Sequence, residues 1–76
     1  MWTIDKIKKH GFQLISNKDL WCHFRGHGFD MYINLDTRIT LGNYFNFHSY
    51  KSSFKGNFKA VLSSDEEMQF LLRIIQ

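Results

Sequence analysis

The sequence predicts a single two-layer α+β domain over residues 1–76, with a short N-terminal helix and a C-terminal amphipathic helix on one face of a four- to five-stranded antiparallel meander. Apolar and polar residues alternate without a break over residues 29–35, which is the period of a half-buried strand. Turn residues recur at short intervals over residues 12–62. An apolar stripe with helical spacing closes the chain, and only a sheet face is large enough to cover it.

Residues 3–10 form the first expected helix. Thr3 is a suitable N-cap, and Asp5 lies in the first turn, where the helix dipole favours an anion. Gly11 follows as a stop signal. The apolar stripe of this helix is narrow, so we expect it to rest on the sheet rather than to be stable alone.

Five stretches of the chain have the period of strands. A turn at residues 17–19 separates the first two, and Gly26-His27-Gly28 leads into the central strand over residues 29–35. A Gly42-Asn43 bend or bulge interrupts the fourth stretch. The expected strands are residues 12–16, 20–25, 29–35, 39–41 with 44–50, and 54–61.

The C-terminal helix begins with a capping box, in which Ser64 and Glu67 satisfy each other's backbone amides. Met68, Leu71, Leu72 and Ile75 follow at helical spacing, and Phe70 and Ile74 widen the stripe. This stripe requires an apolar sheet face. That face is expected to carry Leu20, Cys22, Phe24, Phe29, Met31, Ile33, Leu35, Phe45 and Phe47.

Composition restricts the class of protein. Eight Phe, three Tyr and two Trp in 76 residues allow a very small domain to build a core from few side chains. Cys22 is the single cysteine, so an internal disulfide is excluded. The N-terminus has no apolar run of signal-peptide length, and no stretch approaches a membrane span. We therefore expect a cytoplasmic protein.

Strand parity assigns a set of rings, amides and cations to the face that the helices leave open. Trp, Tyr and Arg carry much of the binding energy in protein interfaces, and aromatic platforms also bind single-stranded nucleic acid. The same rings could instead stabilise the sheet as cross-strand pairs, or form a homodimer interface. The set comprises Trp21, His23, Arg25, Tyr32, Asn34, Tyr44, Asn46, His48 and Tyr50.

Positive charge is concentrated in the body of the domain. The net charge is +3, and residues 63–76 hold three acidic residues and one arginine, so residues 1–62 carry +5. Lys51, Lys55 and Lys59 recur beside phenylalanines and could form a basic edge for phosphates. Alternatively, these lysines are solvated positions that protect the last strand. The charge favours an acidic partner, either nucleic acid or protein.

No catalytic or metal signature emerges from the sequence. Cys22 falls among the apolar residues, where a small core side chain is expected. His23, His27, His10 and His48 do not have the spacing of common zinc sites. No base is placed beside an exposed nucleophile. We therefore expect no enzymatic activity, no metal and no cofactor.

Two resemblances to nucleic-acid-binding families concern short stretches or topology. Residues 25–32, Arg-Gly-His-Gly-Phe-Asp-Met-Tyr, resemble the aromatic octapeptide of RNA-recognition-motif domains. They depart from it at His27 and Asp30, and they come too early in the chain for that family's order of elements. The order helix, strands, helix is similar to that of double-stranded-RNA-binding domains. That family's second helix begins with lysines, whereas this one begins Asp65-Glu66-Glu67, so the function is not carried over.

The whole chain resembles small orphan proteins of phages and mobile elements, including anti-CRISPR inhibitors: it is short, proline-free, aromatic-rich and without catalytic motifs. This resemblance implies stoichiometric binding to a host nucleoprotein complex in the host cytoplasm. The leading hypothesis is a non-enzymatic protein-binding module of the inhibitor kind. Direct nucleic-acid binding through the same rings and the three lysines is the alternative.

Overall fold

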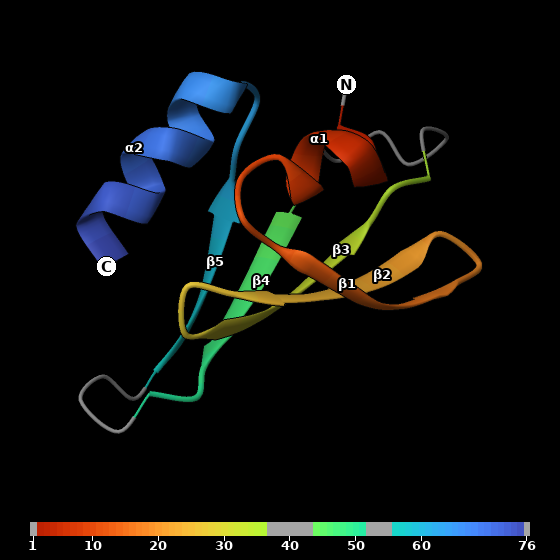
Figure 1. Ribbon diagram of the computed structural model, residues 1–76, viewed down its shortest axis with the longest axis horizontal. Helices are drawn as coiled ribbons and strands as arrows, with labels where there is room; N and C mark the ends of the chain where they lie inside the picture. The colour runs from red at the N-terminus through yellow and green to blue at the C-terminus, as the bar shows by residue number, and fades with distance from the viewer. Residues whose placement is uncertain (1, 37–43, 52–55, 76) are drawn as a thin grey trace.

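The computed structural model describes residues 2–36, 44–51 and 56–75, and its architecture confirms the predicted α+β class (Figure 1). A five-stranded antiparallel sheet has the order β1-β2-β3-β4-β5, so each strand pairs with its neighbours in the sequence. One helix precedes the sheet and one follows it. The elements are α1 Ile4–Lys8, β1 Gln13–Lys18, β2 Trp21–Gly26, β3 Phe29–Asn34, β4 Tyr44–Ser49, β5 Asn57–Val61 and α2 Asp65–Ile75.

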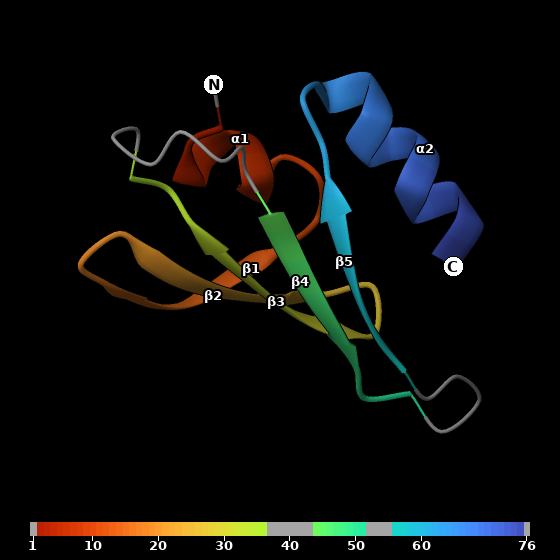
Figure 2. The same cartoon turned by 180° about the vertical axis from the view of Figure 1, so that it is seen from behind.

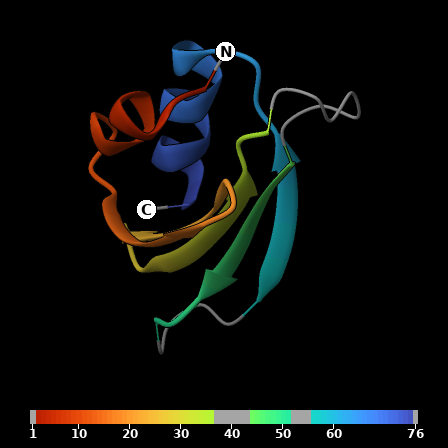
Figure 3. The same cartoon turned by 90° about the vertical axis from the view of Figure 1, so that its right-hand side faces the viewer.

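The two helices lie on the same side of the sheet. Figure 2 places α2 beside β5, whereas α1 packs against β1, and Figure 3 shows the sheet curving around both helices. The inward side chains of β2, β3 and β4 are buried in strict alternation with outward ones. They meet apolar residues from both helices and from the segments around them. The core consists of Trp2, Ile7, Phe12, Cys22, Phe24, Phe29, Met31, Ile33, Phe45, Phe47, Leu62, Met68 and Leu72.

The first two hairpins turn on residues with left-handed backbone. Asp19 and Leu20 have φ of 53° and 67°, and His27 and Gly28 have φ of 54° and 83°. Two-residue turns of this hand match the twist of antiparallel strands. The prediction that Leu20 belongs to the core face was wrong, because Leu20 forms part of the turn and is 44% exposed. The turn lies later than the expected residues 17–19, and β1 extends to Lys18.

The expected caps of the helices are present with one difference. The Thr3 hydroxyl accepts a hydrogen bond from the Lys6 amide at the start of α1. At the start of α2, the Ser64 hydroxyl accepts from the Glu67 amide at 3.2 Å. The Glu67 carboxylate does not return to the Ser64 amide as predicted but accepts from the amide and hydroxyl of Ser63. In this capping box, the hydrogen bonds to the Glu67 carboxylate therefore come from Ser63 instead of Ser64.

Only part of the apolar stripe on α2 is covered. Met68 and Leu72 are buried, whereas Leu71 and Ile75 are half-buried. Phe70 and Ile74 were expected to widen the buried stripe, but they are 64% and 63% exposed. They lie on the helix side opposite Met68, because residues two apart on a helix differ in direction by about 200°. A helix over the edge of a sheet can bury one side only.

The N-terminal segment, residues 2–10, contacts the segment that leads into α2, residues 62–65. The Trp2 indole N–H donates to the carbonyl of Leu62 at 2.7 Å, inside the core. The His10 ring nitrogen Nε2 lies 2.7 Å from Asp65 Oδ1, and Lys6 lies 3.8 Å from the same carboxylate. The hydrogen bond from His10 lowers the pKa of Asp65, and the charge of Lys6 adds to this effect. These contacts hold the start of α2 close to α1.

Several expectations fall on residues outside the described ranges. They are the strand over residues 39–41, the Gly42-Asn43 bend, and the start of the last strand at residues 54–55. Leu35, expected in the core, is half-buried at its border. None of the helices within the described ranges has the length and apolar character needed to cross a membrane.

Candidate protein-binding surface

The face of the sheet that points away from the helices, here called the outer face, carries the residues that strand parity assigned to it. Its four large rings are exposed to solvent: Trp21 by 57%, Tyr32 by 38%, Tyr44 by 48% and Tyr50 by 54%. His23, Asn34 and Asn46 are half-buried beside them. The four rings are therefore not sealed inside the monomer, which is the geometric condition for a contact surface.

Strand register arranges these side chains in two adjacent rows across the sheet. In the first row, His23 of β2 lies opposite Tyr32 of β3, which lies opposite Asn46 of β4 and then Lys59 of β5. Directly opposed residues on one face are within contact distance of each other. The second row runs, in the same strand order, through Arg25, Asp30, His48 and Asn57.

Three aromatic rings form the centre of the outer face. The rings of His23 and Tyr32 are stacked, with centroids 4.4 Å apart and an interplanar angle of 14°. His48 meets Tyr32 edge-on at 5.5 Å and 88°. Stacked and edge-to-face pairs add about 0.5–1.5 kcal/mol each beyond the burial of area. Tyr32 is thus held from both sides and presents a fixed ring to solvent.

Asp30 ties the second row to the first and was not among the predicted site residues. Its Oδ1 atom accepts hydrogen bonds from His23 Nε2 at 2.7 Å and from Arg25 Nε at 2.9 Å. Partial burial raises the pKa of Asp30, but these two hydrogen bonds outweigh that effect and leave the pKa below its ordinary value. The same contact raises the pKa of Arg25. The alternation that places Tyr32 outward also places Asp30 outward. Its contact with Arg25 could not be predicted, because it depends on the register that pairs Arg25 with Asp30.

The remaining rings lie at the margins of this network. The Arg25 guanidinium lies 5.7 Å from the centroid of the Tyr50 ring, a cation–π distance. Trp21 is opposite Asn34 at one end of β2, and Tyr44 is opposite Val61 at one end of β4. The side-chain oxygen of Asn34 accepts from the Asp36 amide, so Asn34 supports the local turn.

Of the three lysines predicted to form a basic edge, the structure describes Lys51 and Lys59. Lys59 is exposed and lies in the row of Tyr32. Lys51 is half-buried, and its aliphatic stem covers Gly28, where an added Cβ would lie 1.8 Å from the lysine Cε. Lys55 lies outside the described residues. Among the described strand positions, the outer face nevertheless carries three cations, Lys18, Arg25 and Lys59, and one carboxylate, Asp30.

The histidines and the cysteine are used in the fold. Burial raises the pKa of the Cys22 thiol, as expected for a core side chain. His27 Nε2 donates to the carbonyl of His10 at 2.6 Å and thereby joins the second hairpin turn to the end of α1. Within the described part of the chain, no three His, Cys, Asp or Glu side chains are grouped to hold a metal ion.

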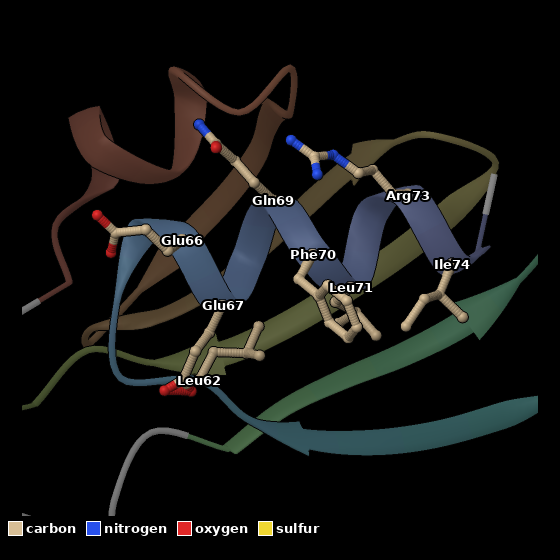
Figure 4. Close-up of a pocket in the computed structure, with 8 residues that line it drawn as sticks. All are labelled: Leu62, Glu66, Glu67, Gln69, Phe70, Leu71, Arg73 and Ile74. Atoms are coloured by element: carbon tan, nitrogen blue, oxygen red, sulfur yellow. The ribbon is translucent and has the colours of Figure 1, made fainter.

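A hollow lies on α2, away from every predicted site residue (Figure 4). Its volume is about 650 Å³, and most of its lining is apolar. The hollow was not predicted, because the apolar residues of α2 were assigned to the stripe that packs on the sheet. It is lined by Leu62, Glu66, Glu67, Gln69, Phe70, Leu71, Arg73 and Ile74.

Comparison with known proteins gives no relative: no protein-family model matches the chain, and neither the curated proteins nor the solved structures searched contain a significant match.

Proposed function

We propose that this chain is a non-enzymatic protein-binding module and that its outer face is the contact surface. The observation that carries the proposal is the set of four rings, each 38% to 57% exposed, on one side of a sheet whose other side is fully occupied by the core. Exposed rings that gather on one face, rather than being scattered over the surface, are typical of an interaction site. Aromatic residues with polar edges are the residues that contribute most at protein interfaces.

The contacts around the rings support recognition by a rigid surface. Tyr32 is fixed by His23 and His48, and Tyr50 is fixed by Arg25. Side chains that are already ordered lose little conformational entropy on binding, so more of the contact energy appears as affinity. The excess of cations on this face favours a partner with an acidic surface.

We further propose that the partner is a host nucleoprotein complex and that binding inhibits it, as in anti-CRISPR proteins of phages. The support is the whole-chain resemblance together with the net charge of +3 and a sequence pI near 9.2. A basic, ring-bearing face is complementary to the nucleic acid that such a complex carries and to acidic patches on its protein surface. Inhibition by occupation needs one chain per complex and no catalytic group.

A cleavage assay tests this proposal directly. A purified RNA-guided nuclease with its guide RNA is titrated with the chain, and cleavage of a matching DNA is measured. We expect inhibition that saturates near one chain per complex and a loss of roughly tenfold or more in potency for Trp21→Ala and for Tyr44→Ala. Phe70→Ala, which removes an exposed ring from α2 instead, is the matched control and should inhibit like the unmodified chain.

Two outcomes of this assay would contradict the proposal. Full cleavage at every ratio, for a panel of such nucleases, would rule out the inhibitor role. Equal potency of Trp21→Ala, Tyr44→Ala and the unmodified chain would remove the outer face as the contact surface. The melting temperature of each variant is measured alongside, and it should stay within a few degrees because both residues are exposed.

Direct nucleic-acid binding is the second candidate, and the position of Lys59 favours it. This exposed lysine lies in the row of Tyr32 and His23, so a phosphate and a stacked base could be held by neighbouring groups. A gel-shift titration with single- and double-stranded oligonucleotides at two salt concentrations tests it. Binding that weakens steeply with salt, with a slope reduced by about 1 in Lys59→Ala, would support this function. The absence of any shift at low salt would exclude it.

A further inference from the structure

The C-terminal helix carries a second exposed apolar surface, separate from the outer face. Phe70 and Ile74 are 64% and 63% exposed, one helical turn apart on the same side of α2. Met68 and Leu72, on the other side, provide the attachment of α2 to the core. A ring and a branched side chain at this spacing, next to a hollow, are typical of a helix surface that packs against another helix.

The charges of this surface have a particular arrangement along the helix. Glu66 and Arg73 are separated by one heptad, so they lie on the same flank of Phe70 and at opposite ends of the helix. Among the described residues, neither makes an ion pair with another side chain of the chain. Figure 4 shows Phe70, Leu71 and Ile74 on one side of α2 and Arg73 on the other. On the flank that Glu66 and Arg73 share, the apolar strip is therefore bordered by an acidic group at one end and a basic group at the other. Glu67 lies on the opposite flank, where its carboxylate accepts hydrogen bonds from Ser63.

We propose that this surface binds the same surface of a second copy, with the two α2 helices antiparallel and a twofold axis near Phe70. Reversal of the helix direction places Glu66 of each copy beside Arg73 of the other, so one interface contains two ion pairs. The apolar strips face each other, with Phe70 against Phe70 at the axis. The dipoles of antiparallel helices also oppose each other favourably.

A second copy fits this surface better than an unrelated helix. When the second helix runs in the opposite direction, its acidic group lies against the basic group of the first copy, and its basic group lies against the acidic one. An acidic partner helix would meet Glu66 unfavourably, and a basic one would meet Arg73. The interface is also small, since an eleven-residue helix is only about 16 Å long. The dimer is consequently reversible and depends on protein concentration.

Sedimentation velocity on the full chain, between roughly 1 μM and 1 mM, measures this association. We expect a shift from monomer to dimer across this range. Phe70→Asp should weaken association by roughly tenfold or more, because a carboxylate would be buried at the axis. Val61→Asp is the matched control: Val61 is exposed by 55%, lies on β5 and should leave the association unchanged.

Charge exchange separates the interface from the stability of the helix itself. Glu66→Arg and Arg73→Glu should each weaken self-association, since like charges then meet across the axis. An equimolar mixture of these two variants should associate at least as well as the unmodified chain, because both cross-pairs are restored only in the mixed dimer. A change in helix stability would persist in the mixture, which circular dichroism of each variant checks.

Three results would overturn the inference. The first is a monomer at all concentrations, and the second is a mixture of charge variants that stays as weak as either variant alone. The third is a dimer that is insensitive to Phe70→Asp and abolished by Trp21→Ala, which would assign self-association to the outer face. This last result would leave the α2 surface without a partner, whereas failure of the cleavage assay would leave the dimer unaffected.

Discussion

Replacing Trp2 by alanine removes the side chain that joins the N-terminal segment, the sheet and the entrance to α2. Trp2 is only 5% exposed, its indole N–H donates to the Leu62 carbonyl, and its ring meets Phe45 edge-on at 5.2 Å and 78°. His10 contacts the same ring at 5.8 Å.

The expected loss of stability is large for a domain of this size. Burial of about 200 Å² of ring surface contributes about 5 kcal/mol at about 25 cal/mol/Å². Measured costs of Trp or Phe to alanine in cores are about 3–5 kcal/mol, and the Leu62 carbonyl left without its donor adds about 1 kcal/mol or more. A 76-residue domain has a total free energy of unfolding of about 4–11 kcal/mol. Trp2→Ala therefore removes a third of the stability or more.

Urea unfolding followed by far-UV circular dichroism measures this effect without relying on tryptophan fluorescence. With an m-value of about 1 kcal/mol/M, the midpoint of Trp2→Ala should fall by about 4–6 M, or the variant should be unfolded without urea. Trp21→Ala is the matched control, because Trp21 is 57% exposed and its loss should cost less than about 1 kcal/mol. Equal losses for the two variants, or a loss below 1 kcal/mol for Trp2→Ala, would refute the role assigned to Trp2.

The network around Asp30 predicts a pH dependence of stability. Because the hydrogen bonds from His23 and Arg25 lower the pKa of Asp30 in the folded chain, its contribution to stability is present above the unfolded pKa of about 3.9 and is lost as the pH falls through the lower, folded value. The free energy of unfolding should therefore drop between pH 5 and pH 2, and Asp30→Asn should drop less; parallel pH profiles for the two proteins would contradict this assignment. Burial of Cys22 predicts that its thiol reacts with a disulfide reagent far more slowly in the folded chain than in urea, and equal rates would show that the thiol is accessible.

Much of the fold could be predicted from local patterns in the sequence. The alternation over residues 29–35 predicted β3, and the capping residues predicted both helix starts. Leu20 was misassigned because its left-handed backbone, with φ of 67°, is unusual for a bulky side chain and is imposed by the hairpin. Trp2 in the core was not foreseen, since its partner Leu62 is 60 residues away.

The outer face could be predicted residue by residue, but its connections could not. Parity alone places Trp21, Tyr32 and Tyr44 outward. The contact of Asp30 with Arg25 requires the register that the turn at residues 27–28 fixes, and a shift by one position would remove it. The exposure of Phe70 and Ile74 depends on where α2 sits relative to the sheet, which no local pattern encodes.

The hydrogen bond between Trp2 and Leu62, here called the clasp, also bears on the order in which the chain folds. Every strand pairs with its neighbour in sequence, so each hairpin closes only a short loop, whereas the clasp closes almost the whole chain at a higher entropic cost. We therefore expect the hairpins to form in the transition state and the clasp to close afterwards. Weakening the clasp then accelerates unfolding while the rate of folding stays nearly constant, so Trp2 governs how long the native molecule persists once formed.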